Sequence, residues 1–205
     1  MNRFLLSRLA LAAFILASCG GVSVSSGSSD ESFSGVFYVS DTPFPCGPAL
    51  EDMCTTLEVA PSSGQTGLIW SPDWNGITGA NGVGIGTGWR NTLDILASVK
   101  GNPVLSAAAY ADAYVFDGKD DWYLPSKDEL NELCKKFSSD RSDVAPEISK
   151  CRGSRAPMHG FSTANYWSST QDADNNAWSQ HFTSGDQYAY YKLNAGYVRP
   201  VRAFR

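Results

Sequence analysis

The sequence predicts one α+β domain, and three observations support this prediction. A chain of 205 residues that is 42% hydrophobic and 12% aromatic can bury one core. Apolar residues recur at helical spacing in the central part of the chain, after residue 90. The C-terminal segment 165–205 instead interleaves large apolar residues with polar runs, as the strands of a half-exposed sheet do. We expect the domain to span residues 36–205.

The first 35 residues predict export and attachment. Arg3 and Arg8 supply a positively charged start, and the apolar run Leu9–Leu16 that follows is too short to cross a bilayer. This order is typical of a signal peptide, here over residues 1–18. The run ends in Leu16-Ala17-Ser18-Cys19, which resembles the lipobox of bacterial lipoproteins. This resemblance implies that Cys19 is lipidated and that the protein is anchored at the outer membrane or cell surface. An ordinary signal peptide is the alternative. Residues 19–35 are rich in Ser and Gly and predict a flexible tether.

The charge of the mature chain limits its partners. Loss of Arg3 and Arg8 with the signal peptide leaves 14 basic against 21 acidic residues, a net charge of −7. Such a chain is repelled by nucleic acid and by anionic surfaces. We therefore expect no nucleic-acid partner, and contact with the membrane only through the lipid.

Four cysteines follow Cys19, and an even number in an exported chain predicts disulfides. Three pairings exist, and proximity in the sequence favours Cys46–Cys54 and Cys134–Cys151. A zinc site is the rival interpretation, which the irregular spacing disfavours, and free buried thiols are the other alternative.

A short strand is expected at residues 36–40, followed by a loop at 41–48, and another short strand is expected at residues 68–70. Residues 76–89 form a glycine-rich stretch that lacks the Lys and Ser/Thr of a phosphate-binding loop, so we interpret it as a structural loop. Helices are expected from Asn91, as N-cap, to Gly101, and over residues 107–116.

A third helix follows a capping box. Ser126 is followed three residues later by Glu129, the pairing in which each side chain bonds the other residue's backbone N–H. The apolar face of this helix consists of Leu130, Leu133, Cys134 and Phe137.

In the C-terminal segment, alternation along an extended chain places Trp178 and Phe182 on the buried face with Trp167, Val198 and Val201 as further core residues. Ser179 and His181 then face solvent or a ligand. Gln180 shares the Trp178 face and should be hydrogen-bonded there or lie at its margin.

Tyrosines in this segment offer flat contact area for a ligand at low entropic cost, although Tyr is also common in ordinary strands. The expected ligand-binding surface comprises Asp172, Asp174, Asn175, Asn176, Ser179, His181, Asp186, Gln187, Tyr188 and Tyr190.

Several motifs, in order, resemble one bacterial family. The segment 120–130, DDWYLPSKDEL, resembles the signature of the C-terminal domain of the Legionella collagen-like adhesin, and the pattern is completed by Tyr166-Trp167-Ser168-Ser169, Ala177-Trp178, Phe182 and Val198-Arg199-Pro200-Val201-Arg202. The resemblance implies a C-type lectin-like fold with a small antiparallel or mixed sheet, two main helices and long loops. The tail is also similar to those of the variable proteins of diversity-generating retroelements, of which Treponema has an example. In such proteins, diversified residues are displayed on a fixed scaffold.

Other chemistries find less support. The calcium-binding triplets of carbohydrate-binding C-type lectins are missing, and Asp172, Asp174 and Asn175 read as a solvated acidic loop, so no metal or cofactor is expected. Formylglycine-generating enzymes share the fold but use cysteines near the C-terminal part of the domain, and this chain has none after Cys151. The chain has two histidines and no G-x-S-x-G motif, so the sequence does not favour a catalytic function. We predict a non-enzymatic surface lipoprotein whose lectin-type domain binds a protein or glycan ligand through residues 165–191. The alternatives are a glycan-binding adhesin of fixed specificity and an envelope enzyme related to the formylglycine-generating enzymes.

Overall fold

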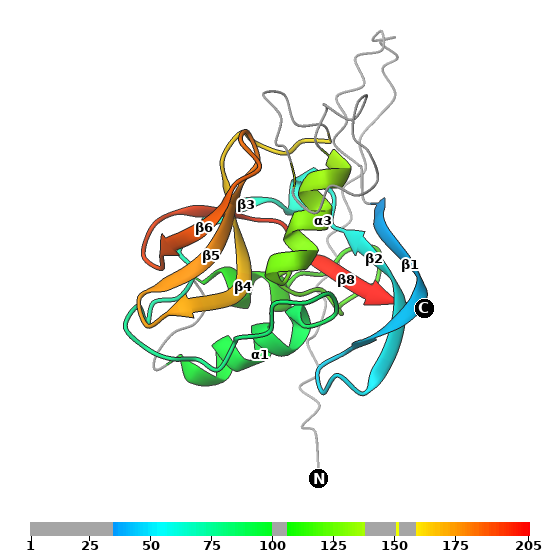
Figure 1. The fold of residues 1–205 in the computed structure, drawn as a ribbon, viewed down its shortest axis with the longest axis horizontal. Coiled ribbons are helices and arrows are strands. Elements are labelled where there is room, and N and C mark those ends of the chain that lie inside the picture. Colours follow the sequence, from blue (N-terminus) through cyan, green and yellow to red (C-terminus); the bar gives the residue numbers. More distant parts are fainter. Residues whose placement is uncertain (1–34, 100–105, 138–150, 152–158) are drawn as a thin grey trace, which may run out of the picture.

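The computed structural model describes residues 35–99, 106–137, 151 and 159–205. The predicted signal peptide, Cys19 and nearly all of the predicted tether lie outside the described residues. Within these residues the chain forms two small sheets and three α-helices, which confirms the α+β class (Figure 1). No helix in the described ranges is long and apolar enough to cross a membrane.

The smaller sheet is antiparallel, with strand order β1-β2-β8. The larger sheet has the order β3-β7-β4-β5-β6 and is mixed, because β4 and β7 run parallel while its other neighbours are antiparallel. The strands are β1 (Gly35–Cys46), β2 (Asp52–Val59), β3 (Thr66–Leu68), β4 (Asn165–Ala173), β5 (Asn176–His181), β6 (Gln187–Tyr191), β7 (Gly196–Val198) and β8 (Val201–Phe204).

The helices are α1 (Gly88–Ser98), α2 (Ala107–Asp112) and α3 (Lys127–Phe137), with a 3-10 turn at Ser62–Gly64. Helix α3 lies between the two sheets and contacts β1, β4 and β5 (Figure 1). One core fills this space, and a second core joins α1 and α2 to the larger sheet. The larger sheet is therefore packed against other parts of the chain on both of its faces. Both the mixed sheet and the long loops agree with the expected lectin-like architecture, and the specific assignment to the C-type lectin fold stays a prediction.

The capping box is confirmed. Glu129 N–H donates to Ser126 Oγ at 3.3 Å, and Ser126 N–H donates to Glu129 Oε2 at 2.7 Å. The four apolar residues predicted for one face of α3, Leu130, Leu133, Cys134 and Phe137, are all buried in the core between the sheets.

Both favoured disulfides are present. Cys46–Cys54 closes the hairpin of β1 and β2, and Cys134–Cys151 ties α3 to the chain that precedes β4. The zinc and free-thiol alternatives are thereby excluded for these four cysteines.

Several predicted boundaries are wrong. Strand β1 runs through most of the expected loop at 41–48, and β2 was not expected at all. Helix α1 begins at Gly88, so Asn91 is not its N-cap: its buried amide accepts from Gly82 N–H and donates to Gly82 O, which fixes the glycine-rich loop to the helix. Helix α2 ends at Asp112, short of residue 116, and the predicted stop at Gly101 lies outside the described residues.

Candidate ligand-binding surface

The C-terminal segment is anchored by buried apolar side chains. Trp167, Phe182, Val198 and Val201 are all buried, as predicted. The indole N–H of Trp167 also donates to Leu68 O at 3.0 Å, so its polar atom is satisfied within the core. These residues form the scaffold from which the neighbouring polar residues project.

Arg199, the first arginine of the Val-Arg-Pro-Val-Arg motif, belongs to this scaffold and is fully buried. Its guanidinium donates to Ala60 O at 2.7 Å and to His159 O at 3.2 Å, and it lies 4.4 Å from the Phe161 ring centroid. Desolvation lowers the pKa of Arg199 to about 10. The side chain thus joins two distant segments, at Ala60 and at His159, through their backbone carbonyls and has a structural role.

Lys192 fixes the tip of the ribbon formed by β4 and β5. Its buried ammonium donates to Gly76 O at 2.7 Å and to Asp174 O at 2.5 Å, and it lies 4.9 Å from the Trp70 ring centroid. Burial lowers the pKa of Lys192 to about 8. Asp174 and Asn175 are exposed and lie in the turn between β4 and β5. The hydrogen bond from Lys192 to Asp174 O therefore fixes the backbone of this turn.

Strands β5 and β6 pair to form a second ribbon, the β5–β6 ribbon, which has two faces. Trp178 lies opposite Ala189 and Gln180 opposite Gln187 on one face, whereas Ser179 lies opposite Tyr188 on the other. We name them the tryptophan face and the tyrosine face.

On the tryptophan face, Trp178 is only half-buried, so its predicted place in the core is wrong. The ammonium of Lys127, at the first turn of α3, lies 3.1 Å from the centroid of the Trp178 ring. Burial lowers the pKa of Lys127. A cavity of about 260 Å³ opens here, lined by Lys127, Asn131, Cys151, Trp178, Gly185, Asp186 and Gln187.

Three carboxamides line or underlie this cavity. Gln180, fully buried, donates to Asn131 Oδ1 at 3.0 Å and to Gly185 O at 3.1 Å, which confirms that it is hydrogen-bonded on the Trp178 face. Gln187 donates to Lys127 O at 2.7 Å and to Gln180 Oε1 at 3.3 Å. The network holds α3 against the β5–β6 ribbon and fixes the shape of the cavity.

On the tyrosine face, Ser179 is buried, and its hydroxyl donates to Tyr188 O at 3.2 Å, so the prediction that it faces solvent or a ligand is wrong. Tyr190 packs against Trp167 with ring centroids 5.2 Å apart, and Tyr188 donates a short hydrogen bond to Asn165 Oδ1. The alternation of side chains along β5 did not predict this burial, because the second core covers this face of the sheet too.

The ten residues predicted for the ligand-binding surface therefore differ in their exposure to solvent. Ser179 is buried; Asp172, Asp174, Asn175 and Asp186 are exposed; Asn176, His181, Gln187, Tyr188 and Tyr190 are half-buried. Only Asp186 and Gln187 line the Trp178 cavity. Lys127 and Asn131 were missed because they come from a helix about 50 residues earlier, and the sequence carries no local signal for that contact.

His181 is the last residue of β5, and its Nδ1 lies 3.4 Å from Ser184 Oγ in the turn that follows. The same hydroxyl accepts the N–H of Asp186 at 3.3 Å, a common arrangement in polar turns. Among the described residues no group of three His, Cys, Asp or Glu side chains could hold a metal ion.

Comparison with known proteins places the chain in a family. No curated protein sequence matches it. Among solved structures, it is similar to a fimbrial protein from Bacteroides ovatus ATCC 8483, with 18% sequence identity and a TM-score of 0.48. This match covers 74% of the present chain but 36% of the fimbrial protein, so the chain spans about a third of that protein's length. The family model described as the Lcl C-terminal domain, after the Legionella collagen-like protein, matches residues 62–202. Because this match covers more than half of the sequence, the chain belongs to the Lcl C-terminal domain family.

Proposed function

We propose that this protein is a lipid-anchored surface adhesin that binds a protein or glycan ligand through residues 165–191 and the start of α3. The observation that carries the proposal is the cavity in which the Trp178 indole, the Lys127 ammonium, two carboxamides and the Asp186 carboxylate meet. Membership of the Lcl C-terminal domain family supports a surface adhesin-like role.

The side chains of this cavity suit recognition rather than catalysis. An indole offers a flat apolar surface, and carboxamides donate and accept hydrogen bonds at fixed positions. The Gln180–Asn131–Gln187 network holds these groups before a ligand arrives, which reduces the entropic cost of binding. We therefore propose a binding role without an enzymatic activity.

Removal of side chains from the cavity should weaken ligand binding without unfolding the domain. The full chain in detergent is applied to arrays of purified glycans and of purified extracellular matrix proteins. Trp178→Ala and Gln187→Ala should each weaken the binding by about tenfold or more, since contacts central to a site dominate its affinity. Val115→Ala, at a side chain that is 61% exposed and does not line the cavity, is the matched control. Equal binding by all three variants would contradict the proposed site.

We also propose that the segment is diversified by a retroelement. The support is the interleaving of exposed polar residues such as Asp172, Asp174 and Asn175 with a fixed scaffold of buried residues. Sequencing of the locus should find a reverse-transcriptase gene and a near-copy of the tail's coding sequence. If both are missing, the fixed-specificity adhesin is the better interpretation.

Anchoring through Cys19 has its own test. Cys19→Ala should release the protein from the membrane fraction, because a signal peptide without the acceptor cysteine leaves no lipid on the mature chain. Fractionation of cells followed by immunoblotting measures this directly. Retention of the variant in the membrane fraction would exclude lipidation as the means of attachment.

A further inference from the structure

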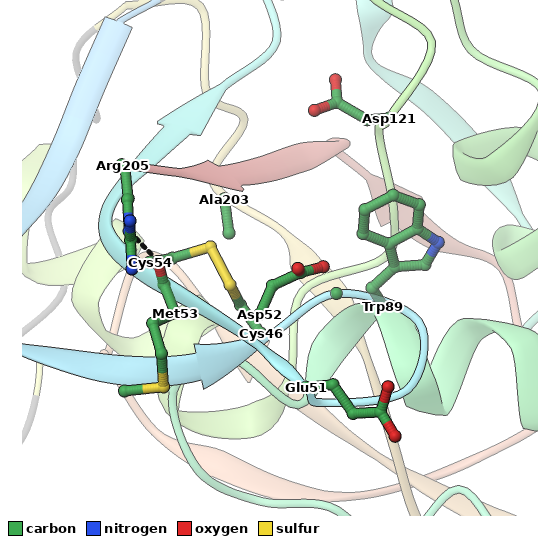
Figure 2. A pocket seen from close by; sticks show the side chains of 10 residues that line it. Cys46, Glu51, Asp52, Met53, Cys54, Trp89, Asp121, Ala203 and Arg205 are labelled. Atoms are coloured by element: carbon green, nitrogen blue, oxygen red, sulfur yellow. Dashed lines mark hydrogen bonds between the residues drawn. A yellow bond between two sulfur atoms is a disulfide. The ribbon is translucent and has the colours of Figure 1, made fainter.

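A second and larger cavity lies on the side of the domain that carries the β1–β2 hairpin, whereas the β5–β6 ribbon occupies the other side (Figure 1). Its volume of about 510 Å³ is in the range of pockets that enclose a small ligand or a side chain. The residues that line it, drawn in Figure 2, are Cys46, Gly47, Glu51, Asp52, Met53, Cys54, Trp89, Asp121, Ala203 and Arg205.

One wall is the indole of Trp89, at the start of α1. The ring stacks on Tyr123, with centroids 6.0 Å apart and an interplanar angle of 11°. Tyr123 is buried, and its hydroxyl donates to Glu129 Oε1 at 3.2 Å. The indole is therefore held in one orientation, with its remaining surface available to the cavity.

The opposite wall is the β1–β2 hairpin, closed by the Cys46–Cys54 disulfide. The glycine-rich loop packs directly on the end of β1: Gly86, at φ 90°, lies so close that a Cβ there would be 1.9 Å from Pro45 O. This contact requires glycine and fixes the start of α1 against the hairpin. The two walls are thus held in a fixed relation before any ligand binds.

The charges of the cavity are predominantly negative, and part of that charge is uncompensated. Asp121 is paired with Arg202 through two hydrogen bonds of 2.7 Å. Within the described part of the chain, by contrast, no hydrogen bond or ion pair engages the carboxylates of Glu51 and Asp52. Figure 2 shows the Asp52 carboxylate projecting from the hairpin on the side that faces Trp89. The one cation on the wall, Arg205, donates to Met53 O at 3.0 Å.

We propose that this cavity binds the guanidinium group of an arginine presented by a partner protein. A planar guanidinium stacks on an indole and donates paired hydrogen bonds to a carboxylate, so Trp89 together with Asp52 forms a complementary site. Glu51, whose carboxylate points away from Trp89 in Figure 2, adds negative charge to the lining. The acidic residues here do not form a group that could hold a metal ion among the described residues, which favours an organic cation. The negative charge of the whole chain adds a long-range attraction for a basic partner. The proposal is independent of the ligand at the Trp178 cavity.

The test uses the full chain in detergent and two capped peptides, acetyl-Gly-Arg-Gly-amide and its citrulline counterpart, which has the same shape but no charge. The readout is the indole N–H signal of Trp89 in a nitrogen-edited NMR spectrum, assigned by its loss in Trp89→Phe. The arginine peptide should shift this signal, and the citrulline peptide should bind at least about tenfold more weakly, a difference of about 1.4 kcal/mol.

Asp52→Asn should also weaken arginine binding by about tenfold, because it removes the unpaired carboxylate but keeps its size. Asp41→Asn, an equal loss of charge at an exposed β1 residue outside the cavity, should leave binding unchanged. Both substitutions are at exposed side chains, so folding should persist even if Trp89→Phe proves unstable. Equal binding of the two peptides, an unshifted Trp89 signal, or an equal effect of Asp41→Asn and Asp52→Asn would overturn the proposal.

Discussion

Glu129→Ala should destabilise the domain by about 3–5 kcal/mol, because it leaves three buried donors without an acceptor. The fully buried carboxylate accepts from Gly86 N–H at 2.8 Å, Ser126 N–H at 2.7 Å and Tyr123 OH at 3.2 Å. It thus connects the glycine-rich loop, the N-terminus of α3 and the strand-like segment before it. Urea unfolding monitored by tryptophan fluorescence measures the loss, and Glu132→Gln, on the more exposed side of the same helix, is the control that should change stability by less than about 0.5 kcal/mol.

The same carboxylate should make stability depend on pH. Desolvation raises the pKa of Glu129 from 4.5 to about 7, in opposition to the hydrogen bonds that favour the charged form. A raised pKa means that the folded chain binds the proton more tightly than the unfolded chain does. Stability should therefore fall by up to about 3 kcal/mol as the pH rises from about 4.5 to about 7, and should be nearly level outside that window as far as this group is concerned.

Glu129→Gln removes the titrating carboxyl but keeps one acceptor oxygen, so it tests the pH dependence and the hydrogen bonds separately. An amide cannot accept at both of its terminal atoms, so one of the donors from Gly86 or Ser126 loses its partner, at a cost of about 1–3 kcal/mol. The slope of stability against pH in this window should also become flatter. If Glu129→Gln has the same stability and the same slope as the natural chain between pH 4 and pH 8, the account of this carboxylate is wrong.

Arg199→Ala should lower the free energy of unfolding by about 3–5 kcal/mol, a loss as large as that expected for Glu129→Ala. The substitution removes a buried side chain and leaves the carbonyls of Ala60 and His159 without the guanidinium donors. Arg199→Lys should cost less but should not restore the natural stability, because an ammonium on a flexible stem does not reproduce the fixed fork of the guanidinium.

The matched control for Arg199 is Arg90→Ala. Arg90 forms an exposed ion pair with Asp94 one helical turn away, and such pairs contribute about 0.3–0.5 kcal/mol. Equal losses of unfolding free energy for the Arg90 and Arg199 variants in urea titrations would show that Arg199 has no special structural role.

Local features could be predicted from the sequence. The capping box of Ser126 and Glu129 and the apolar face of α3 depend on residues within a few positions of one another. The two disulfides followed from proximity in the chain. The start of α1 was misplaced because Asn91, a favourable capping residue, instead uses its amide to bind the glycine-rich loop.

The binding surface could be predicted only in part, for a physical reason. Alternation distinguishes inside from outside only when one face of a sheet is solvated, and the larger sheet has cores on both faces. Ser179 was therefore placed outside although it is buried, and Trp178 was placed in the core although Lys127 covers part of it at a half-open surface. Lys192 and Arg199 are likewise buried cations, a position that composition alone argues against.

We propose that a fixed scaffold in the C-terminal segment of this protein carries an exchangeable binding surface. The most direct measurement is a display library randomised together at exposed and half-buried positions, sorted once for folding and separately for binding to arrayed glycans and matrix proteins. The randomised positions are Asp172, Asp174, Asn175, Asn176, His181, Asp186, Gln187, Tyr188 and Tyr190. Substitutions at the exposed positions usually change stability by less than about 0.5 kcal/mol, and those at half-buried positions such as Gln187 and Tyr190 should cost more. A large share of the members should therefore fold while their binding specificities differ. A parallel library at the buried Trp167, Phe182, Lys192 and Arg199 should mostly fail to fold. If the first library unfolds as often as the second, or folds with unchanged binding, the claim is contradicted.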